Sequence, residues 1–266
     1  MPNVEELSEG QTGLIESAVR HAIPSLIKIP AKLKPAFQAS IIVPVYNEAD
    51  IISRTMRCIS GYLGPDYELI VCDDASTDGT HDVLRNLADK NPNIRLLGFE
   101  KRIGKGGTIK KAVEIADSDL IVYVDADLSA SLDDLPRLCE AASKKDALVI
   151  SRRTMRGRLT QGVLRLALSI GYNLIVRLIF RTGIADHQCG FKAMNKKVAR
   201  KLIAQTSNDG FVFDTELIVR AKRSAIPVEE IQIGWAERRP KRANTRWLRT
   251  SFEMMKDLTV LKENLP

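Results

Sequence analysis

The sequence predicts an α/β fold in which a mostly parallel sheet is flanked by helices. Between residues 40 and 151, short apolar runs alternate with segments of helical periodicity. The apolar runs are continuous, as in strands that are covered on both faces. The chain has 266 residues, of which 44% are hydrophobic and 27% charged. Since no Gly/Ser-rich or Pro-rich linker divides it, we expect one large domain with appendages.

The apolar runs predict five strands in order along the chain. They are SIIVPV (40–45), YELIVCD (67–73), IRLLGF (94–99), DLIVYVD (119–125) and ALVIS (147–151). Helices are predicted between them, at 49–62, 78–90, 107–117 and 131–144.

Two apolar segments lie outside this alternation. Residues 12–34 place apolar side chains at near-helical spacing, with basic residues towards one end and Pro24 as a breaker. This segment could lie on a membrane surface or pack as a helix on the domain or a partner subunit. The segment 164–180 has only 11 uncharged residues between Arg165 and Arg177, fewer than the roughly 20 that span a bilayer.

The charge is unevenly distributed, with a net +7 overall. Residues 1–150 carry 17 basic and 23 acidic side chains, whereas residues 151–266 carry 23 and 10. A basic half could attract nucleic acid, an anionic membrane surface or a phosphorylated ligand. The four cysteines show no metal-site spacing, so we expect free thiols in a reducing cytoplasm. The N-terminus does not lead from cationic residues into an apolar run, so we expect no secretory signal.

Polar residues gather where the predicted strands end: PVYNE (44–48), CDDAST (72–77), DADLS (125–129) and SRR (151–153). In open parallel sheets, ligands bind beyond the carboxyl ends of the strands, where the strand order reverses. We therefore expect four neighbouring strands to direct carboxylates and arginines to one edge of the sheet.

Asp125 and Asp127 are the strongest candidates for a metal site. In an extended segment, side chains at i and i+2 point the same way, so both carboxylates can converge while Ala126 turns aside. Mg²⁺ or Mn²⁺ binds a few carboxylates and completes its shell with water or phosphate oxygens. The alternative is a strand end whose aspartates cap the next turn.

The segment KRIGKGGTIKKA (101–112) is either a phosphate loop at a helix N-terminus or a flexible basic turn. It lacks the GxxxxGK[ST] spacing, and no GxGxxG follows the first strand. Neither a P-loop NTPase nor a dinucleotide-binding enzyme is therefore expected.

Three downstream segments carry further polar groups. Asp214 could cap a helix and Glu216 could complement its dipole, or both could line a pocket. We expect His187 at the surface or in a hydrogen bond, and no zinc site, because the three histidines show no HxxxH spacing. The basic, Trp-containing segment 235–249 could stack on nucleic-acid bases, close over a nucleotide diphosphate or meet anionic lipid. The acidic first half weighs against nucleic acid.

Together these stretches resemble the family 2 glycosyltransferases of GT-A fold, and within them the dolichyl-phosphate mannose and glucose synthases. The resemblance covers about residues 40–260 and lies in PVYNE, VCDDASTDGT, GKGGTIKKA, DADLS, SRR, DHQCGFKA, FVFDTEL and VEEIQIGWAE, which occur in the family's order. It implies an N-terminal amphipathic segment (1–36), a Rossmann-like GT-A catalytic domain (37–235), and a basic loop with a C-terminal helix (236–266).

The resemblance also implies roles for individual residues. Asp125 and Asp127 would bind Mg²⁺ or Mn²⁺ on the diphosphate of a sugar nucleotide. The residues implied to hold its nucleoside are Pro44, Tyr46, Glu48, Val71 and Asp73. Ala126 and Ser129 would line the same donor site, while Arg152 and one of Arg239, Lys241 and Arg242 would contact the phosphates. Mannose synthases usually carry Gln where this chain has Ser129, and their C-terminal SK pair reads KRAN or ANT here.

The implied reaction is inverting transfer of glucose or mannose from a UDP- or GDP-sugar to a polyprenyl phosphate at a membrane surface. A phosphate monoester is mostly dianionic at pH 7 and needs no general base. A family 2 enzyme acting on a glycan or small-molecule hydroxyl is the alternative, and its base would be Asp186, Asp214 or Glu216. A protein that binds nucleic acid or membranes without catalysis is a third hypothesis. QCGFK followed by FDTE favours the glucosyl branch. Membrane contact would be peripheral, on the cytoplasmic face, through 12–34, 159–181 or the basic half.

Overall fold

The computed structural model describes residues 38–63, 66–154, 159, 162–238 and 246–265. Three sets of predictions lie outside these residues: the helix at 12–34, the segment 1–36 that contains it, and the phosphate contacts of Arg239, Lys241 and Arg242. Residues 37–266 form one compact unit, and the following description concerns that unit alone.

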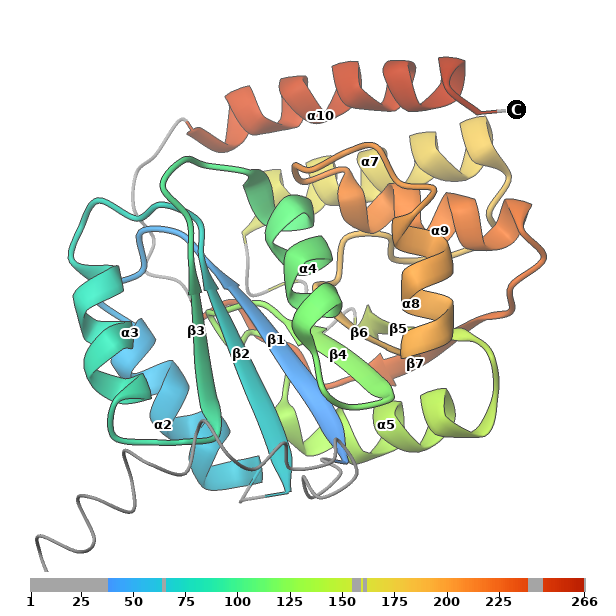
Figure 1. Ribbon diagram of the computed structural model, residues 1–266. Coiled ribbons are helices and arrows are strands. Elements are labelled where there is room, and N and C mark those ends of the chain that lie inside the picture. Colours follow the sequence, from blue (N-terminus) through green and yellow to red (C-terminus); the bar gives the residue numbers. More distant parts are fainter. Residues whose placement is uncertain (1–37, 64–65, 155–158, 160–161, 239–245, 266) are drawn as a thin grey trace, which may run out of the picture. The chain divides into compact units, whose positions relative to one another are not determined.

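A seven-stranded sheet forms the centre of this unit, in the order β3-β2-β1-β4-β6-β5-β7 (Figure 1). Neighbouring strands are parallel, except that β6 runs antiparallel to both β4 and β5. This confirms the predicted α/β class with a mostly parallel sheet. The strands are β1 Ala39–Val45, β2 Tyr67–Asp73, β3 Ile94–Gly98, β4 Leu120–Val124, β5 Leu148–Arg153, β6 Phe191–Asn195 and β7 Val228–Ile233.

Helices cover both faces of the sheet because alternate residues of each strand point to opposite faces. Ile41 and Val43 of β1 pack with α2 Ile52–Leu63, α3 Thr80–Ala88 and α5 Leu135–Lys144, which the short 3₁₀ helix η2 Leu132–Asp134 precedes. Ile42 packs on the other face with α4 Gly104–Ile115, α8 Lys196–Ile203 and α9 Phe213–Arg223. These side chains are almost completely buried, and each contributes roughly 1.5–3 kcal/mol of burial free energy.

Two further helices pack on α9, as Figure 1 shows. These are α7 Val163–Phe180 and α10 Arg246–Glu263. Tyr172, Val176 and Phe180 form a buried row on α7 against Val219 of α9 and Leu258 of α10. Among the described residues, α7 is the one helix that is long and apolar enough to cross a membrane by length and composition, and 28% of it is buried.

Neither β6 nor β7 is among the five strands predicted from the sequence, and β6 changes the predicted edge. Because β6 lies between β4 and β5, the end of β5 is not next to the end of β4, so the expectation of four neighbouring strands is wrong. The prediction failed because β6 contains Lys192, which does not look like a core residue. Lys192 is nevertheless fully buried.

The order of the sheet nevertheless creates one natural binding edge. From β1 the chain adds β2 and β3 on one side and β4 on the other, so the order reverses between β1 and β4. The carboxyl ends of these parallel strands carry Tyr46, Asp73 and Asp125, which places the candidate site at the reversal point.

Candidate active site

The DAD segment forms a tight turn immediately after β4. The amide of Asp125 donates to the Gly190 carbonyl (3.1 Å), and the amide of Leu128 donates back to the Asp125 carbonyl (3.2 Å). Asp127 Oδ1 accepts the Ser129 amide at 2.9 Å. A side chain at Gly190 would overlap the Asp125 carboxylate, so this position requires glycine. One oxygen of Asp127 thus caps the turn, as the alternative interpretation predicts. Both aspartates are half-buried at the edge of the sheet.

A buried lysine–aspartate cluster lies beside this turn and consists of Lys105, Tyr123, Asp125, Lys192 and Asp214. Lys105 Nζ lies 2.8 Å from Asp125 Oδ1 and 2.8 Å from Asp214 Oδ2. Asp214 Oδ1 also accepts from Lys192 Nζ (2.6 Å) and from the Tyr123 hydroxyl (2.7 Å). Burial would raise the pKa of Asp214, but the two lysines outweigh it and lower the pKa to about 2. Asp214 is therefore ionised at neutral pH. It does not cap α9, because the N-cap residue of that helix is Val212.

The amides at the start of α4 are used within the chain. Asp74 Oδ1 accepts the amides of Ile103 (2.7 Å) and Gly104 (3.2 Å). The carbonyl of Asp209 accepts the Gly106 amide at 2.7 Å. In this structure the segment 101–112 is therefore a capped helix start, which differs both from a free phosphate loop and from a flexible turn.

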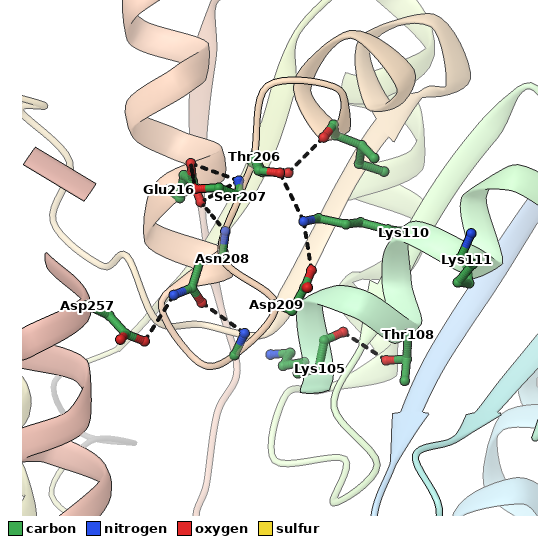
Figure 2. Close-up of polar contacts among 12 residues, drawn as sticks. Lys105, Thr108, Lys110, Lys111, Thr206, Ser207, Asn208, Asp209, Glu216 and Asp257 are labelled. Carbon is green, nitrogen blue, oxygen red and sulfur yellow. Dashed lines mark hydrogen bonds and ion pairs between the residues drawn. The ribbon is translucent and has the colours of Figure 1, made fainter. Parts of the chain in front are cut away.

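Glu216 shapes the loop that caps α4, as Figure 2 shows. Its carboxylate accepts the amides of Ser207 (3.1 Å) and Asn208 (2.8 Å). The same carboxylate is paired with Arg220 (3.1 Å). The same loop receives Lys110, whose ammonium donates to the Thr206 carbonyl and to Asp209. Glu216 is fully buried, so its role in this structure is to order the loop.

The ends of β1 and β2 bring together most of the residues implied for the nucleoside. Tyr46 lies under the guanidinium of Arg102, 3.8 Å from its ring centre. Asp73 is buried and accepts from the Ser76 amide (3.2 Å) and pairs with His81 Nδ1 (2.8 Å). Pro44 and Glu48 are half-buried at the same edge. The side chain of Val71 is fully buried in the core and does not reach the surface.

The arginines after β5 behave differently from each other. Arg152 is exposed and donates to Gln232 Oε1 (3.1 Å). Arg153 is almost buried, and its guanidinium donates two hydrogen bonds to Asp186 (2.6 and 2.8 Å) and lies 5.4 Å from the Trp235 ring centre. Asp186 is thereby committed to an internal ion pair.

His187 is buried and hydrogen-bonded, so the second of its two expected settings, a hydrogen bond, is the one observed. Its ring contacts Thr182 Oγ1 (2.8 Å) and Asn173 Oδ1 (2.9 Å). Burial lowers the pKa of His187 to about 4, so the ring is neutral at pH 7.

Comparisons with known proteins decide the family. Residues 40–203 match the model of glycosyl transferase family 2. The chain belongs to this family. Glycosyltransferase AglD of Haloferax volcanii is 33% identical over 220 residues, which are 77% of this chain and 35% of AglD. Dolichyl-phosphate beta-glucosyltransferase ALG5C of Trichomonas vaginalis is 31% identical over 228 residues, which are 79% of this chain and 68% of that protein.

Solved structures share the fold of this glycosyltransferase. Glucosyl-3-phosphoglycerate synthase from Mycobacterium tuberculosis, in complex with Mn²⁺, UDP and glucosyl-3-phosphoglycerate, aligns with a TM-score of 0.60 at 21% identity. The alignment covers 89% of this chain and 82% of the synthase. A complex of the same synthase with Mg²⁺ and UDP aligns with a TM-score of 0.61 at 20% identity. The GT-A fold expected from the sequence motifs is confirmed.

Sequence reasoning missed several residues at the site of this glycosyltransferase. Lys192 lies within the quoted QCGFK motif, but the sequence gives no sign that it pairs with Asp214. Lys105 lies in the segment 101–112, for which the sequence predicts either a phosphate loop or a flexible basic turn, and Tyr123 lies in a predicted strand. A lysine flanked by buried residues in a short apolar segment was the available signal, because such a lysine needs an acidic partner.

The carboxylates of Asp125 and Asp127 could hold a divalent metal ion if phosphate oxygens of a ligand complete its coordination shell. Among the described residues there is no group of three or more His, Cys, Asp or Glu side chains that could hold a metal. Two carboxylates suffice when phosphate oxygens complete the shell of a hard cation. The buried hydroxyl of Ser129, two residues after Asp127, has no hydrogen-bond partner within the part of the chain that the structure describes. This polar atom is consistent with a ligand-binding turn.

Proposed function

We propose that this family 2 glycosyltransferase moves a hexose from a sugar nucleotide to a polyprenyl phosphate, with inversion and with a divalent metal. Relatives from several organisms, at 26–31% identity, are named dolichyl-phosphate beta-glucosyltransferases. Glucose from a UDP donor is therefore the first combination to test, ahead of mannose from GDP. The matched residues cover 35% of AglD and 68% of ALG5C, so the chain spans only part of each relative. The sugar donor and the acceptor of this protein are therefore part of the proposal.

The observation that carries the proposal is the state of the three candidate general bases. Asp186 is paired with Arg153, Asp214 with two lysines, and Glu216 with backbone amides and Arg220. A hydroxyl acceptor must lose a proton during attack and requires such a base. A phosphate acceptor, with a second pKa of about 6, attacks as the dianion that it already is at pH 7. Commitment of these carboxylates to internal contacts favours the phosphate acceptor over a glycan or small-molecule hydroxyl.

In the proposed reaction, an acceptor phosphate oxygen attacks the anomeric carbon from the face opposite the leaving group. The bond from that carbon to the donor β-phosphate oxygen breaks, and the nucleoside diphosphate leaves with the bonding electrons. A single displacement of this kind inverts the anomeric configuration and forms no covalent enzyme intermediate.

The chain's own residues would act on the donor. Tyr46, Glu48 and Asp73 would hold the nucleoside, with Pro44 and Val71 shaping the strand ends behind it. Asp125 and Asp127, with the turn through Ala126 and Ser129, would hold Mg²⁺ or Mn²⁺. The metal would supply positive charge against the negative charge that develops on the departing diphosphate.

Cationic side chains would add to the positive charge that faces the departing diphosphate. Lys105 lies against Asp125 and brings an ammonium group to the turn that would hold the metal. Arg152 is exposed and accessible to a phosphate. One of Arg239, Lys241 and Arg242 would provide a further contact, as the family resemblance implies.

Peripheral membrane contact, on the cytoplasmic face, belongs to the same proposal. Opposite its buried row, α7 exposes large apolar side chains, among them Val163, Leu164, Leu174 and Leu178. Arg165 and Arg177 are exposed on the same helix. An apolar row with basic residues suits a helix that lies in the lipid headgroup region, where a polyprenyl phosphate presents its phosphate.

The test is transfer of labelled sugar to a lipid. Purified protein is incubated with Mn²⁺ and either UDP-[¹⁴C]glucose or GDP-[¹⁴C]mannose, with dolichyl phosphate or dolichol as acceptor. We expect lipid-extractable label with dolichyl phosphate and none with dolichol, which lacks the phosphate. Equal labelling of both acceptors would favour a hydroxyl acceptor, and no lipid label with any common donor would refute the proposal.

A further inference from the structure

We infer that His81, held by Arg85, is a positioning residue that fixes the Asp73 carboxylate for recognition of the donor's nucleoside base. The inference rests on the proposed function, because it assumes that Asp73 meets the base. His81 lies outside the motifs that carry the family resemblance, directly after the last residue of VCDDASTDGT.

Both oxygens of Asp73 are held in this structure. Oδ2 lies 2.8 Å from His81 Nδ1, and Oδ1 accepts the Ser76 amide at 3.2 Å. Two contacts on two different oxygens fix the plane of the carboxylate. Each carboxylate oxygen has two lone pairs, so each oxygen keeps an acceptor site for an N–H group of a base.

Arg85 determines which nitrogen of His81 carries the hydrogen. Arg85 Nη2 lies 3.1 Å from His81 Nε2, and a guanidinium can only donate. Nε2 must therefore accept, which places the ring hydrogen on Nδ1, where it donates to Asp73. His81 and Arg85 are four residues apart on α3 and so lie on the same face of that helix.

The neighbouring strand leaves room for the ring. Gly98 of β3 lies opposite Asp73 in the sheet register. A Cβ at Gly98 would approach His81 Cε1 to 2.9 Å, closer than real Cβ contacts come. Three elements thus converge on one arrangement: β2 supplies the carboxylate, α3 the imidazole and arginine, and β3 the space.

This arrangement has a specific consequence for recognition. Nucleoside bases such as uracil and guanine present ring N–H groups, and a carboxylate that is already in position binds them without first losing rotational freedom. The diphosphate and metal subsite at Asp125 and Asp127 does not involve His81. Loss of His81 should therefore weaken binding of ligands that contain a base and leave binding of a bare diphosphate unchanged.

The test compares two ligands by calorimetry: UDP with Mg²⁺, and pyrophosphate with Mg²⁺. We expect His81→Ala to weaken UDP binding roughly tenfold or more, as for loss of a hydrogen bond to a charged group, with unchanged pyrophosphate binding. His81→Asn is the matched control, because the asparagine amide nitrogen can take the place of Nδ1 and should restore most of the UDP affinity. Gly98→Ala, which displaces the ring, should behave like His81→Ala.

In steady-state assays, His81→Ala should raise the KM for the donor with little change in kcat, because the base does not react. The inference is overturned if His81→Ala binds UDP like the wild type, if it loses UDP and pyrophosphate affinity equally, or if His81→Asn fails to restore UDP binding. Thermal unfolding of each variant establishes that it is folded. Failure of the wild-type protein to bind UDP or GDP would instead refute the proposed function, and this inference with it.

Discussion

Asp214 illustrates at the scale of one residue how the surroundings of a carboxylate decide its role. Its position at the start of a helix among aromatic residues is compatible with a cap, a pocket residue or a base. In the structure it neutralises Lys105 and Lys192, two cations that burial would otherwise make costly. A carboxylate with a pKa of about 2 accepts no proton near pH 7, so it is unsuited to act as a base.

Replacing Asp214 by Asn should therefore destabilise the protein rather than remove a catalytic base. Loss of the charge leaves the buried ammonium of Lys192 without a carboxylate partner and Lys105 with Asp125 alone. We therefore expect a decrease of about 3–5 kcal/mol in the free energy of unfolding at pH 7. Because the folded-state pKa is lowered, this stabilisation is present above the unfolded pKa of about 3.9 and is lost as pH falls through about 2.

Urea unfolding at pH 7 and pH 3 measures this effect, and the difference between wild type and Asp214→Asn should be smaller at pH 3. Tyr123→Phe is the control, because it removes one hydrogen bond to Asp214 and keeps both ion pairs, at a cost of about 1 kcal/mol. A loss below that in Asp214→Asn would contradict the assignment.

Replacing Asp127 should have the opposite effect: activity should be lost while the fold is kept. Asp127→Asn keeps an oxygen that can accept the Ser129 amide, so the turn should remain folded, but it removes a charged metal ligand. We expect turnover to fall roughly a thousandfold, because metal charge is worth several kcal/mol in such a transition state. Retention of most of the activity would remove the metal assignment. Asp89→Asn, an exposed aspartate at the end of α3, should leave activity unchanged.

At the scale of elements, α7 combines two surfaces. One row of side chains packs on α9 and α10, while the opposite row is apolar and exposed. A helix that only needed to pack on the domain would carry polar residues on its outer face. The exposed leucines therefore support the proposed membrane contact.

Leu174→Glu with Leu178→Glu should weaken binding to anionic liposomes by about tenfold or more per side chain, given the free energy of burying a leucine. Liposome flotation measures this, and UDP binding should be unaffected because neither residue lies at the ends of β1, β2 or β4. Tyr62→Glu changes an exposed apolar side chain on α2 and is the matched control. Equal effects of the α7 and α2 variants would argue against a specific membrane-binding helix.

At the scale of the whole molecule, the reversal of strand order between β1 and β4 creates the site. It brings Asp73 and Asp125, which are 52 residues apart in the sequence, to one edge of the sheet. A ligand that bridges these strand ends binds the folded chain and not the unfolded one. Its binding free energy is therefore added to the stability of the fold.

UDP with Mn²⁺ at about 100 times its Kd should stabilise the protein by about 2.7 kcal/mol, which raises the Tm by about 5–10 °C. Differential scanning fluorimetry measures the shift, and UDP with EDTA should give a smaller one if the metal bridges Asp127 to the diphosphate. An equal shift with and without metal would argue against that bridge. Adenosine diphosphate provides a comparison for the base.

Much of the sheet and its binding edge could be predicted from the sequence. Continuous apolar strands and intervening helices were found within a few residues of their observed bounds, and PVYNE, CDDAST and DADLS lie at the carboxyl ends as expected. These features are encoded locally, in the period of apolar residues and in the polar residues that end a strand. The ordered motifs also determined the family.

The tertiary structure alone decided how the candidate site residues are paired. Lys105 meets Asp214 across 109 residues of sequence, and Lys192 lies in an antiparallel strand inserted between β4 and β5. His81 reaches Asp73 because a glycine of the adjacent strand leaves space. Such contacts depend on strand order and on the packing of distant segments, which no local pattern specifies. The sequence thus determined which residues reach the sheet edge, while the fold decided which of their charges are already neutralised.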